Sequence, residues 1–326
     1  MFALKVGLVV VSMISVAIGA GIRAAPYYMP LDNNGQDFDM AKVIQASGVK
    51  QFILAFALAS DDGQCIPTWD GKLNQKVADD TVVLGKVKAI RAAGGDVSVS
   101  FGGYNGVDLG KACHDVNSLA NAYQIVIDKY SLTNVDFDVE HDNLGDVQGE
   151  TRRFQAIKLL QQKAKSSGKQ LFVTLTLPST TVGLSDLGKN EIKRGVELGA
   201  KMDLYKIMAF DYGGPGADQV NSVISVMEQI HKQLKELRKD LNDQQVYAAT
   251  GLILMNGHTD QPSELYTIDT FRKLIDYANQ KHLGRVSYWA LNRDRKCTKP
   301  VGWVDGSCSS LEQQPWDFTK TLANFH

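Results

Sequence analysis

The feature that most constrains the fold is a repeated alternation of apolar, β-rich segments with amphipathic helical segments. Eight segments have the length and the β-branched and aromatic content of buried strands. Between the later ones, apolar residues in 219–241 and 271–278 repeat with the helical period, which predicts helices with one buried face. The predicted strands span residues 25–30, 51–58, 96–101, 134–140, 170–177, 204–210, 246–254 and 285–291.

Strands that alternate with helices in this number predict an α/β fold, the (β/α)8 TIM barrel. The hydrophobic fraction of 44% is enough for a sizeable core, and no linker or low-complexity tract divides the chain. We therefore expect a single barrel domain over residues 21–326. An open, doubly wound sheet is the alternative, although the Gly-x-Gly-x-x-Gly motif of its nucleotide-binding form does not follow the first strand.

Residues 1–20 have the pattern of a signal peptide. Lys5 precedes an apolar run over 6–18, and small residues up to Ala20 offer a cleavage site, whereas an uncleaved N-terminal anchor is the alternative. Cleavage would give a secreted, extracellular protein with no further membrane contact, in an oxidising compartment where cysteines form disulfides. Among the pairings open to Cys65, Cys113, Cys297 and Cys308, spacing favours Cys297–Cys308.

Three acidic residues alternate with apolar residues in the fourth predicted strand. Side chains alternate along a strand, so Asp136, Asp138 and Glu140 share one face. In a barrel the apolar set packs on the surrounding helices, and the acids point inward and rise towards the open mouth. Crowding should raise at least one carboxyl pKa, as a general acid requires near neutral pH. A solvated edge strand or a divalent-cation site are the alternatives.

Other strand ends carry residues that suit a binding site. Because the active site of such a barrel lies at the carboxyl ends of its strands, these residues are expected to meet the acids. They are Ser100, Gly102, Gly103 and Tyr104 after the third strand, Met208, Asp211 and Tyr212 after the sixth, and Trp289 in the eighth.

Four motifs in order, "SFGG", "TNVDFDVE", "MAFD" and "YWAL", resemble the signatures of glycoside hydrolase family 18, the chitinases. The resemblance covers the chain after the signal segment and is to the compact bacterial type, which lacks an α+β insertion before the last strand. It implies retaining, substrate-assisted hydrolysis of β-1,4-linked N-acetylglucosamine, in which the 2-acetamido oxygen of the substrate is the nucleophile. No cofactor or metal is implied.

The same resemblance assigns roles to single residues. Glu140 would be the general acid and base, Asp138 would hold the acetamido N–H and relay charge to Glu140, and Asp136 would support Asp138. The relatives also suggest the second disulfide, Cys65–Cys113. Substrate-binding positions would be Tyr27, Gly102, Gly103, Tyr104, Met208, Asp211, Tyr212 and Trp289.

Some positions depart from the family pattern. Thr133 and Asn134 replace the first residues of the acidic signature, at the buried start of the strand. Phe210 stands where many members have a tyrosine that binds the acetamido carbonyl. Either Tyr212 compensates for the missing hydroxyl or the site works without it. The short connection between the last two strands predicts an open cleft and an endo-type chitinase. Trp69 is expected either to line that cleft or to pack within its loop.

We expect a monomer whose partner is chitin or a chitooligosaccharide. The formal net charge of −1 gives no indication of nucleic-acid binding. By strand alternation, His141 should face away from Glu140 unless the strand has ended before it. Competing hypotheses are a catalytically weak, lectin-like chitin-binding protein, an endo-β-N-acetylglucosaminidase acting on glycoproteins, and a metal-dependent barrel hydrolase.

Overall fold

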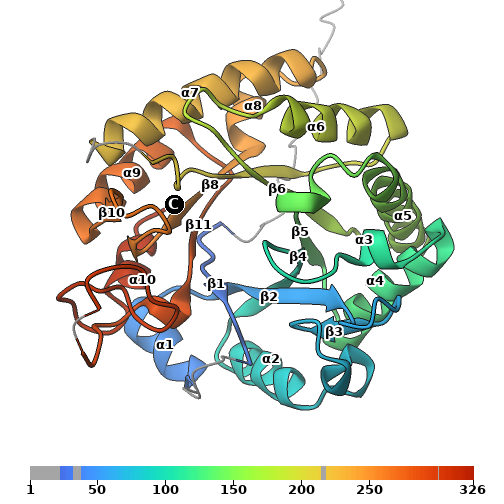
Figure 1. Ribbon diagram of the computed structural model, residues 1–326, viewed down its shortest axis with the longest axis horizontal. Helices are drawn as coiled ribbons and strands as arrows, with labels where there is room; N and C mark the ends of the chain where they lie inside the picture. Colours follow the sequence, from blue (N-terminus) through green and yellow to red (C-terminus); the bar gives the residue numbers. More distant parts are fainter. Residues whose placement is uncertain (1–22, 32–37, 214–217, 300) are drawn as a thin grey trace, which may run out of the picture.

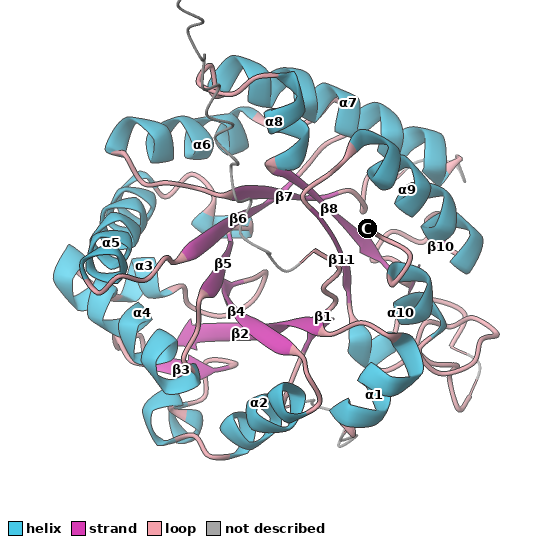
Figure 2. Ribbon diagram, turned by 180° about the vertical axis from the view of Figure 1, so that it is seen from behind, coloured by secondary structure: helices cyan, strands magenta, loops and turns pink. Residues whose placement is uncertain are grey.

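The computed structural model describes residues 23–31, 38–213, 218–299 and 301–326, so the predicted signal peptide lies outside the described residues. A ring of parallel strands forms the centre, and helices surround it (Figures 1 and 2). The predicted TIM barrel is confirmed. In order around the ring, the strands are β1 (Tyr27–Tyr28), β2 (Gln51–Ala59), β4 (Asp96–Gly102), β5 (Asn134–Asp138), β6 (Phe172–Pro178), β7 (Leu204–Met208), β8 (Thr250–Met255) and β11 (Arg285–Trp289).

The first and last strands lie next to each other. Just before β1, Ala24 bridges Val286 of β11 in parallel, and the Ala25 N–H donates to the Val286 carbonyl at 3.1 Å. Pairing between these two segments joins the ends of the sheet, so side chains from β1 and β11 reach the same interior as those from β5.

Helices form the outer layer. The helix predicted over 219–241 is α7, whose buried residues repeat with the helical period. That apolar stripe packs on the outside of the barrel, as the sequence pattern requires. The helices are α1 (Met40–Ser47), α2 (Val82–Ala92), α3 (Leu109–Ala112), α4 (Val116–Tyr130), α5 (Val147–Ser166), α6 (Asp186–Leu198), α7 (Gln219–Leu237), α8 (Asp243–Ala248), α9 (Ile268–Lys281) and α10 (Asp317–Leu322).

The seventh predicted strand began too early. Residues 246–248, which were expected in the strand, belong to α8. Asn242 caps this helix by accepting from the Gln245 N–H, while the Gln245 side chain accepts from the Asn242 N–H, a reciprocal capping box. The cap therefore overrides the β propensity of Val246 and Tyr247. The sequence also gave no indication of β3 (Pro67–Trp69), which pairs antiparallel with β2.

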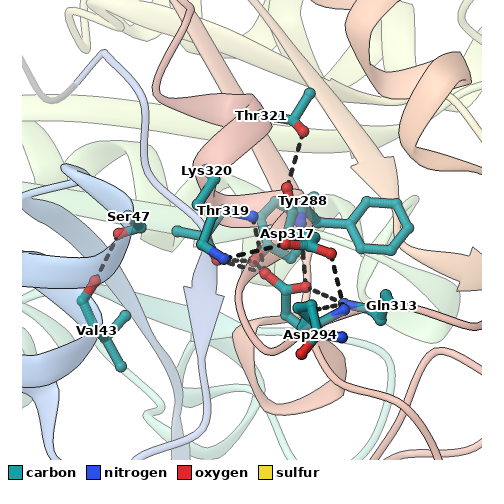
Figure 3. Close-up of polar contacts among 11 residues, drawn as sticks. Val43, Ser47, Tyr288, Asp294, Gln313, Asp317, Thr319, Lys320 and Thr321 are labelled. Carbon is teal, nitrogen blue, oxygen red and sulfur yellow. Dashed lines mark hydrogen bonds and ion pairs between the residues drawn. The ribbon is translucent and has the colours of Figure 1, made fainter.

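A buried carboxylate fixes the C-terminal helix to the last barrel strand (Figure 3). Asp294 accepts hydrogen bonds from the N–H groups of Phe318 and Thr319 at 3.1 and 2.8 Å. It also accepts from the hydroxyl of Tyr288 on β11 at 3.1 Å and from the Gln313 amide at 2.7 Å. These bonds join the start of α10 to β11, so the C-terminal segment is part of the barrel wall.

Both disulfides are formed as expected, Cys65–Cys113 and Cys297–Cys308. The first joins the segment after β2 to the segment after β4, and the second closes a loop after β11. None of the helices in the described part of the chain is long and apolar enough to cross a bilayer.

Candidate active site

The acidic residues of β5 face the interior of the barrel. Asp136 is 0% exposed and Asp138 is 4% exposed. On the opposite face, Phe137 stacks on Phe101 with ring centroids 5.2 Å apart, and Tyr123 of α4 meets it edge-on. The two alternating sets of β5 therefore lie on opposite faces, as predicted. Glu140 follows the end of the strand and is partly buried.

Asp136 is held by four donors from four different strands. Its Oδ2 accepts from the Tyr27 hydroxyl at 2.9 Å, the Ser100 hydroxyl at 2.7 Å and the Lys206 ammonium at 3.2 Å. Its Oδ1 accepts from the Thr176 hydroxyl at 2.8 Å. The bond from the Lys206 ammonium is charge-assisted, and the four donors together hold the carboxylate in one position.

Asp138 is held less tightly. Its Oδ2 accepts from the Tyr27 hydroxyl at 3.3 Å, whereas its Oδ1 is buried and has no hydrogen-bond partner among the described residues. Burial, and then the charges of Glu140 and Asp136, raise the pKa of Asp138 well above its usual value, against the attraction of Lys206. Asp138 thus has a strong tendency to carry a proton, which it can share with the neighbouring Glu140.

Burial raises the pKa of Glu140 to about 7, with a further contribution from the charge of Asp211, while Asp138 opposes the shift. A carboxylic acid with such a pKa is half protonated near neutral pH. It can donate a proton to a leaving group and take one back from water.

Two glycines let β4 approach the acid row closely. Gly102 has φ +96°, and a Cβ there would lie 2.2 Å from the Asp138 carbonyl oxygen. A Cβ on Gly103 would meet the Phe56 ring at 2.8 Å, and the Gly103 N–H donates to the Asp138 carbonyl at 2.9 Å. A side chain at Gly102 would push β4 away from Asp138, and one at Gly103 would displace the Phe56 ring.

An aromatic group lines the interior beside the acids. Trp289 stacks on Phe56 with ring centroids 5.4 Å apart and an interplanar angle of 13°, and it meets Tyr27 edge-on at 5.7 Å. Met208 and Phe210 belong to the same inner cluster. Trp289 is partly exposed, so part of its ring remains open to a ligand.

Two other aromatic residues have different positions. Tyr104 is 61% exposed and contacts the ring of His141, with centroids 5.0 Å apart. Strand β5 ends at Asp138, so the alternation of side chains along a strand no longer sets the direction of His141.

Trp69 is only 1% exposed and donates to the Tyr130 hydroxyl at 2.8 Å. Trp69 is therefore buried between β3 and α4, and it neither lines the cleft nor packs within a loop.

The loop after β7 is organised by a residue that the sequence did not single out. Glu264, 2% exposed, accepts from the N–H groups of Asp211, Tyr212 and Gly213 at 2.7, 2.7 and 3.0 Å. The Thr259 hydroxyl donates to it at 3.2 Å. This carboxylate therefore fixes the turn at Asp211, whose φ is +62°. Glu264 looks like an ordinary loop acid in the sequence, and no local signal distinguishes it.

Two buried cations were also missed. Lys206 on β7 and Arg285 on β11 are 0% and 1% exposed, and the Arg285 guanidinium donates to the Thr174 hydroxyl at 3.0 Å. A lysine in the otherwise apolar segment "LYKIMAF" was the available signal, because charged residues are rarely buried without a partner.

The chain is similar in sequence to two curated chitinases. A probable bifunctional chitinase/lysozyme of Escherichia coli strain K12 is 31% identical over 265 residues, which cover 78% of this chain and 29% of the relative. Endochitinase 11 of Metarhizium anisopliae is 29% identical over 265 residues, covering 78% of this chain and 50% of the relative. The chain thus spans half or less of these relatives. No family model matches it.

The fold has a close counterpart among solved structures. The catalytic domain of the hyperthermophilic chitinase of Pyrococcus furiosus superposes with a TM-score of 0.80 at 26% identity, over 92% of this chain and 93% of that one. Catalytic-site mutants of active domain 2 of a thermostable chitinase of P. furiosus, which superpose with the same TM-score of 0.80 at 26% identity, have also been crystallised with chito-oligosaccharides.

Proposed function

We propose that this chain, a member of glycoside hydrolase family 18, is a chitinase that cleaves β-1,4 linkages between N-acetylglucosamine units. The observation that carries the proposal is the row of three acids, whose exposure increases from Asp136, which is buried and held by four donors, to Glu140 at the mouth. The sequence similarity to two chitinases supports it. So does the crystallised complex of the P. furiosus domain with chito-oligosaccharides.

The proposed reaction begins with proton transfer from Glu140 to the glycosidic oxygen. As the C1–O bond breaks, the acetamido carbonyl oxygen of the same sugar attacks the anomeric carbon and gives a cyclic oxazolinium-type intermediate. Asp138 is ionised in this step, because the proton that it shares with Glu140 resides on Glu140 before transfer. Its Oδ1, which has no hydrogen-bond partner among the described residues, accepts the acetamido N–H and stabilises the positive charge that develops there. Glu140, now ionised, takes a proton from water, which attacks C1 and opens the ring with net retention.

The remaining residues hold the substrate and the acids in place. Trp289, backed by Phe56 and Tyr27, offers a partly exposed ring on which the reacting sugar stacks. Asp211 and Tyr212 lie on the turn that Glu264 fixes and contribute polar groups to the same subsite. In this proposal, the protein supplies an acid, an aromatic floor and a fixed acceptor, and the nucleophile belongs to the substrate.

An endo-type action and secretion are also part of the proposal. The described connection from β8 to β11 contains the short hairpin of β9 (Gly257–His258) and β10 (Leu265–Tyr266), followed by α9. This compact connection favours a cleft that accepts a chain in its middle. Two disulfides are compatible with an oxidising, extracellular location.

Hydrolysis of chitin oligosaccharides by the wild type and by Glu140→Gln tests the proposal, with Glu312→Gln as control because Glu312 lies far from the acids in sequence and its side chain is 84% exposed. We expect the first substitution to abolish cleavage and the second to preserve it, with no effect of EDTA. Binding of chitin without cleavage by the wild type would instead indicate a lectin. Loss of cleavage in EDTA would indicate a metal hydrolase, and glycan release from glycoproteins without chitin cleavage an endo-β-N-acetylglucosaminidase.

A further inference from the structure

Lys206 is a buried cation beside the acid row, and the mechanism above does not use it. By alternation along β7 it faces inward with Leu204 and Met208. Its Nζ lies 3.2 Å from the Asp136 Oδ2, and both side chains are 0% exposed. The ammonium also lies 4.3 Å from the ring centroid of Tyr27, the residue that donates to both aspartates.

The neighbouring strand leaves room for this lysine. Gly251 on β8 pairs with Lys206 on one side and with Arg285 on the other. A Cβ on Gly251 would lie 3.1 Å from the Lys206 Cγ and 3.4 Å from the Arg285 Cβ. The missing side chain thus gives space to the aliphatic stems of two buried cations.

The charges around Lys206 come from several strands. Asp136 and Asp138 face it from β5, Arg285 from β11 and the Tyr27 phenol from β1. Burial lowers the pKa of Lys206 to about 8, a shift that Asp136 opposes and Arg285 reinforces. Lys206 is therefore largely charged at neutral pH. An uncompensated buried carboxylate is costly, and a contacting cation removes much of that cost.

We propose that Lys206 is a positioning residue whose positive charge keeps Asp136 ionised, so that the exchangeable proton of the acid row stays on Asp138 and Glu140. Four hydrogen-bond donors then hold the Asp136 carboxylate in a fixed position below Asp138 and Glu140. The proton remains at the two acids nearest the mouth, where Glu140 delivers it. The catalytic consequence rests on the proposed chitinase function, whereas the protonation of Asp136 does not.

Two substitutions separate charge from hydrogen bonding. Lys206→Gln keeps an N–H donor and removes the charge, and Lys206→Met removes both. Loss of a positive charge favours protonation of the neighbouring acids. For both variants we expect the acid limb of kcat/KM against pH to move up by about one unit, a roughly tenfold loss of activity below the limb. In an Asp136→Asn background, Lys206→Gln should add only a smaller shift, because Asp138 is then the one aspartate of the pair on which the charge still acts.

Two results would overturn the proposal. An unchanged acid limb with activity lowered equally at every pH would reduce Lys206 to a structural role. A shift in Lys206→Met but not in Lys206→Gln would assign the effect to the hydrogen bond instead of the charge. If Lys206→Met does not fold, the position of the acid limb of kcat/KM in Lys206→Gln alone tests the proposal.

Infrared difference spectra provide a readout that needs no turnover. At neutral pH, Lys206→Gln should show an additional band of a buried, protonated carboxylic acid relative to wild type. The band should be absent when Asp136→Asn is combined with Lys206→Gln. If the wild type cleaves no chitin, the proposed function fails but these spectra still test Lys206, and absence of the additional band overturns the inference.

Discussion

Replacing Glu264 with glutamine should loosen the turn that carries Asp211 and Tyr212. The carboxylate offers two oxygens to four donors, and an amide has only one oxygen. The glutamine side chain is expected to place its oxygen towards the N–H groups of Tyr212 and Gly213. Its NH2 group then faces the Thr259 hydroxyl, which can rotate and accept, but it also faces the Asp211 N–H, which cannot. One buried backbone donor is therefore left unpaired.

The magnitude follows from these contacts. An unsatisfied buried donor costs about 1–3 kcal/mol, and the remaining bonds lose their charge assistance, which makes such bonds roughly twice as strong as neutral ones. We expect Glu264→Gln to lower the free energy of unfolding by about 2–4 kcal/mol. For a chain of this size that corresponds to a fall in Tm of roughly 4–8 °C.

Thermal unfolding and chitin oligosaccharide kinetics check the prediction together. Glu312→Gln is the matched control, since that side chain is 84% exposed and its ion pair with Lys296 contributes little. Because the Asp211 charge adds to the pKa of Glu140, a displaced turn should also move the basic limb of kcat/KM to lower pH. A Tm within 1 °C of wild type, with an unchanged limb, would refute the reasoning, since the carboxylate would then not hold the turn (~0.5 kcal/mol or less).

Three further predictions follow from the same contacts. Activity of the wild type should fall as pH rises through about 7, because the raised pKa of Glu140 means that the acid form needed for proton donation is lost there; a pH profile of kcat/KM checks it. Tyr27→Phe removes hydroxyl bonds to both aspartates but keeps the ring, so kcat should fall about tenfold or more with a smaller change in KM, measured by steady-state kinetics. Replacing Cys297 and Cys308 with serine opens a loop of sequence separation 11 and should cost about 2–3 kcal/mol of stability, measured by denaturant unfolding.

The fold and the face of each strand were accessible from the sequence because both depend on local periodicity. The apolar and acidic sets of β5 obey the two-residue repeat of a strand, and the barrel follows from the number of strand–helix units. The main boundary error arose where the Asn242–Gln245 capping box starts a helix inside a β-rich segment. A reciprocal pair of hydrogen bonds outweighs modest differences in propensity.

The partners of the acids were less accessible, because they depend on reach across the barrel. Periodicity places Lys206 on the inner face of β7 but does not say that its ammonium reaches Asp136 on β5, with β6 between them. Similarly, nothing local to Glu264 shows that it accepts from three consecutive N–H groups more than 50 residues earlier. Such contacts are fixed by the closed sheet and by loop packing.

The substitution at Phe210 shows how such a contact changes an expectation based on residue type. Tyr212 is the expected source of the missing hydroxyl, but its OH lies 2.8 Å from the Ser179 hydroxyl. Ser179 donates its own proton to the Met208 carbonyl at 2.6 Å, so within this pair Tyr212 is the donor. Tyr212 can therefore bind an acetamido carbonyl only by exchanging its bond to Ser179. The gain is the difference between two hydrogen bonds, which is smaller than the contribution of a tyrosine whose hydroxyl has no other buried acceptor.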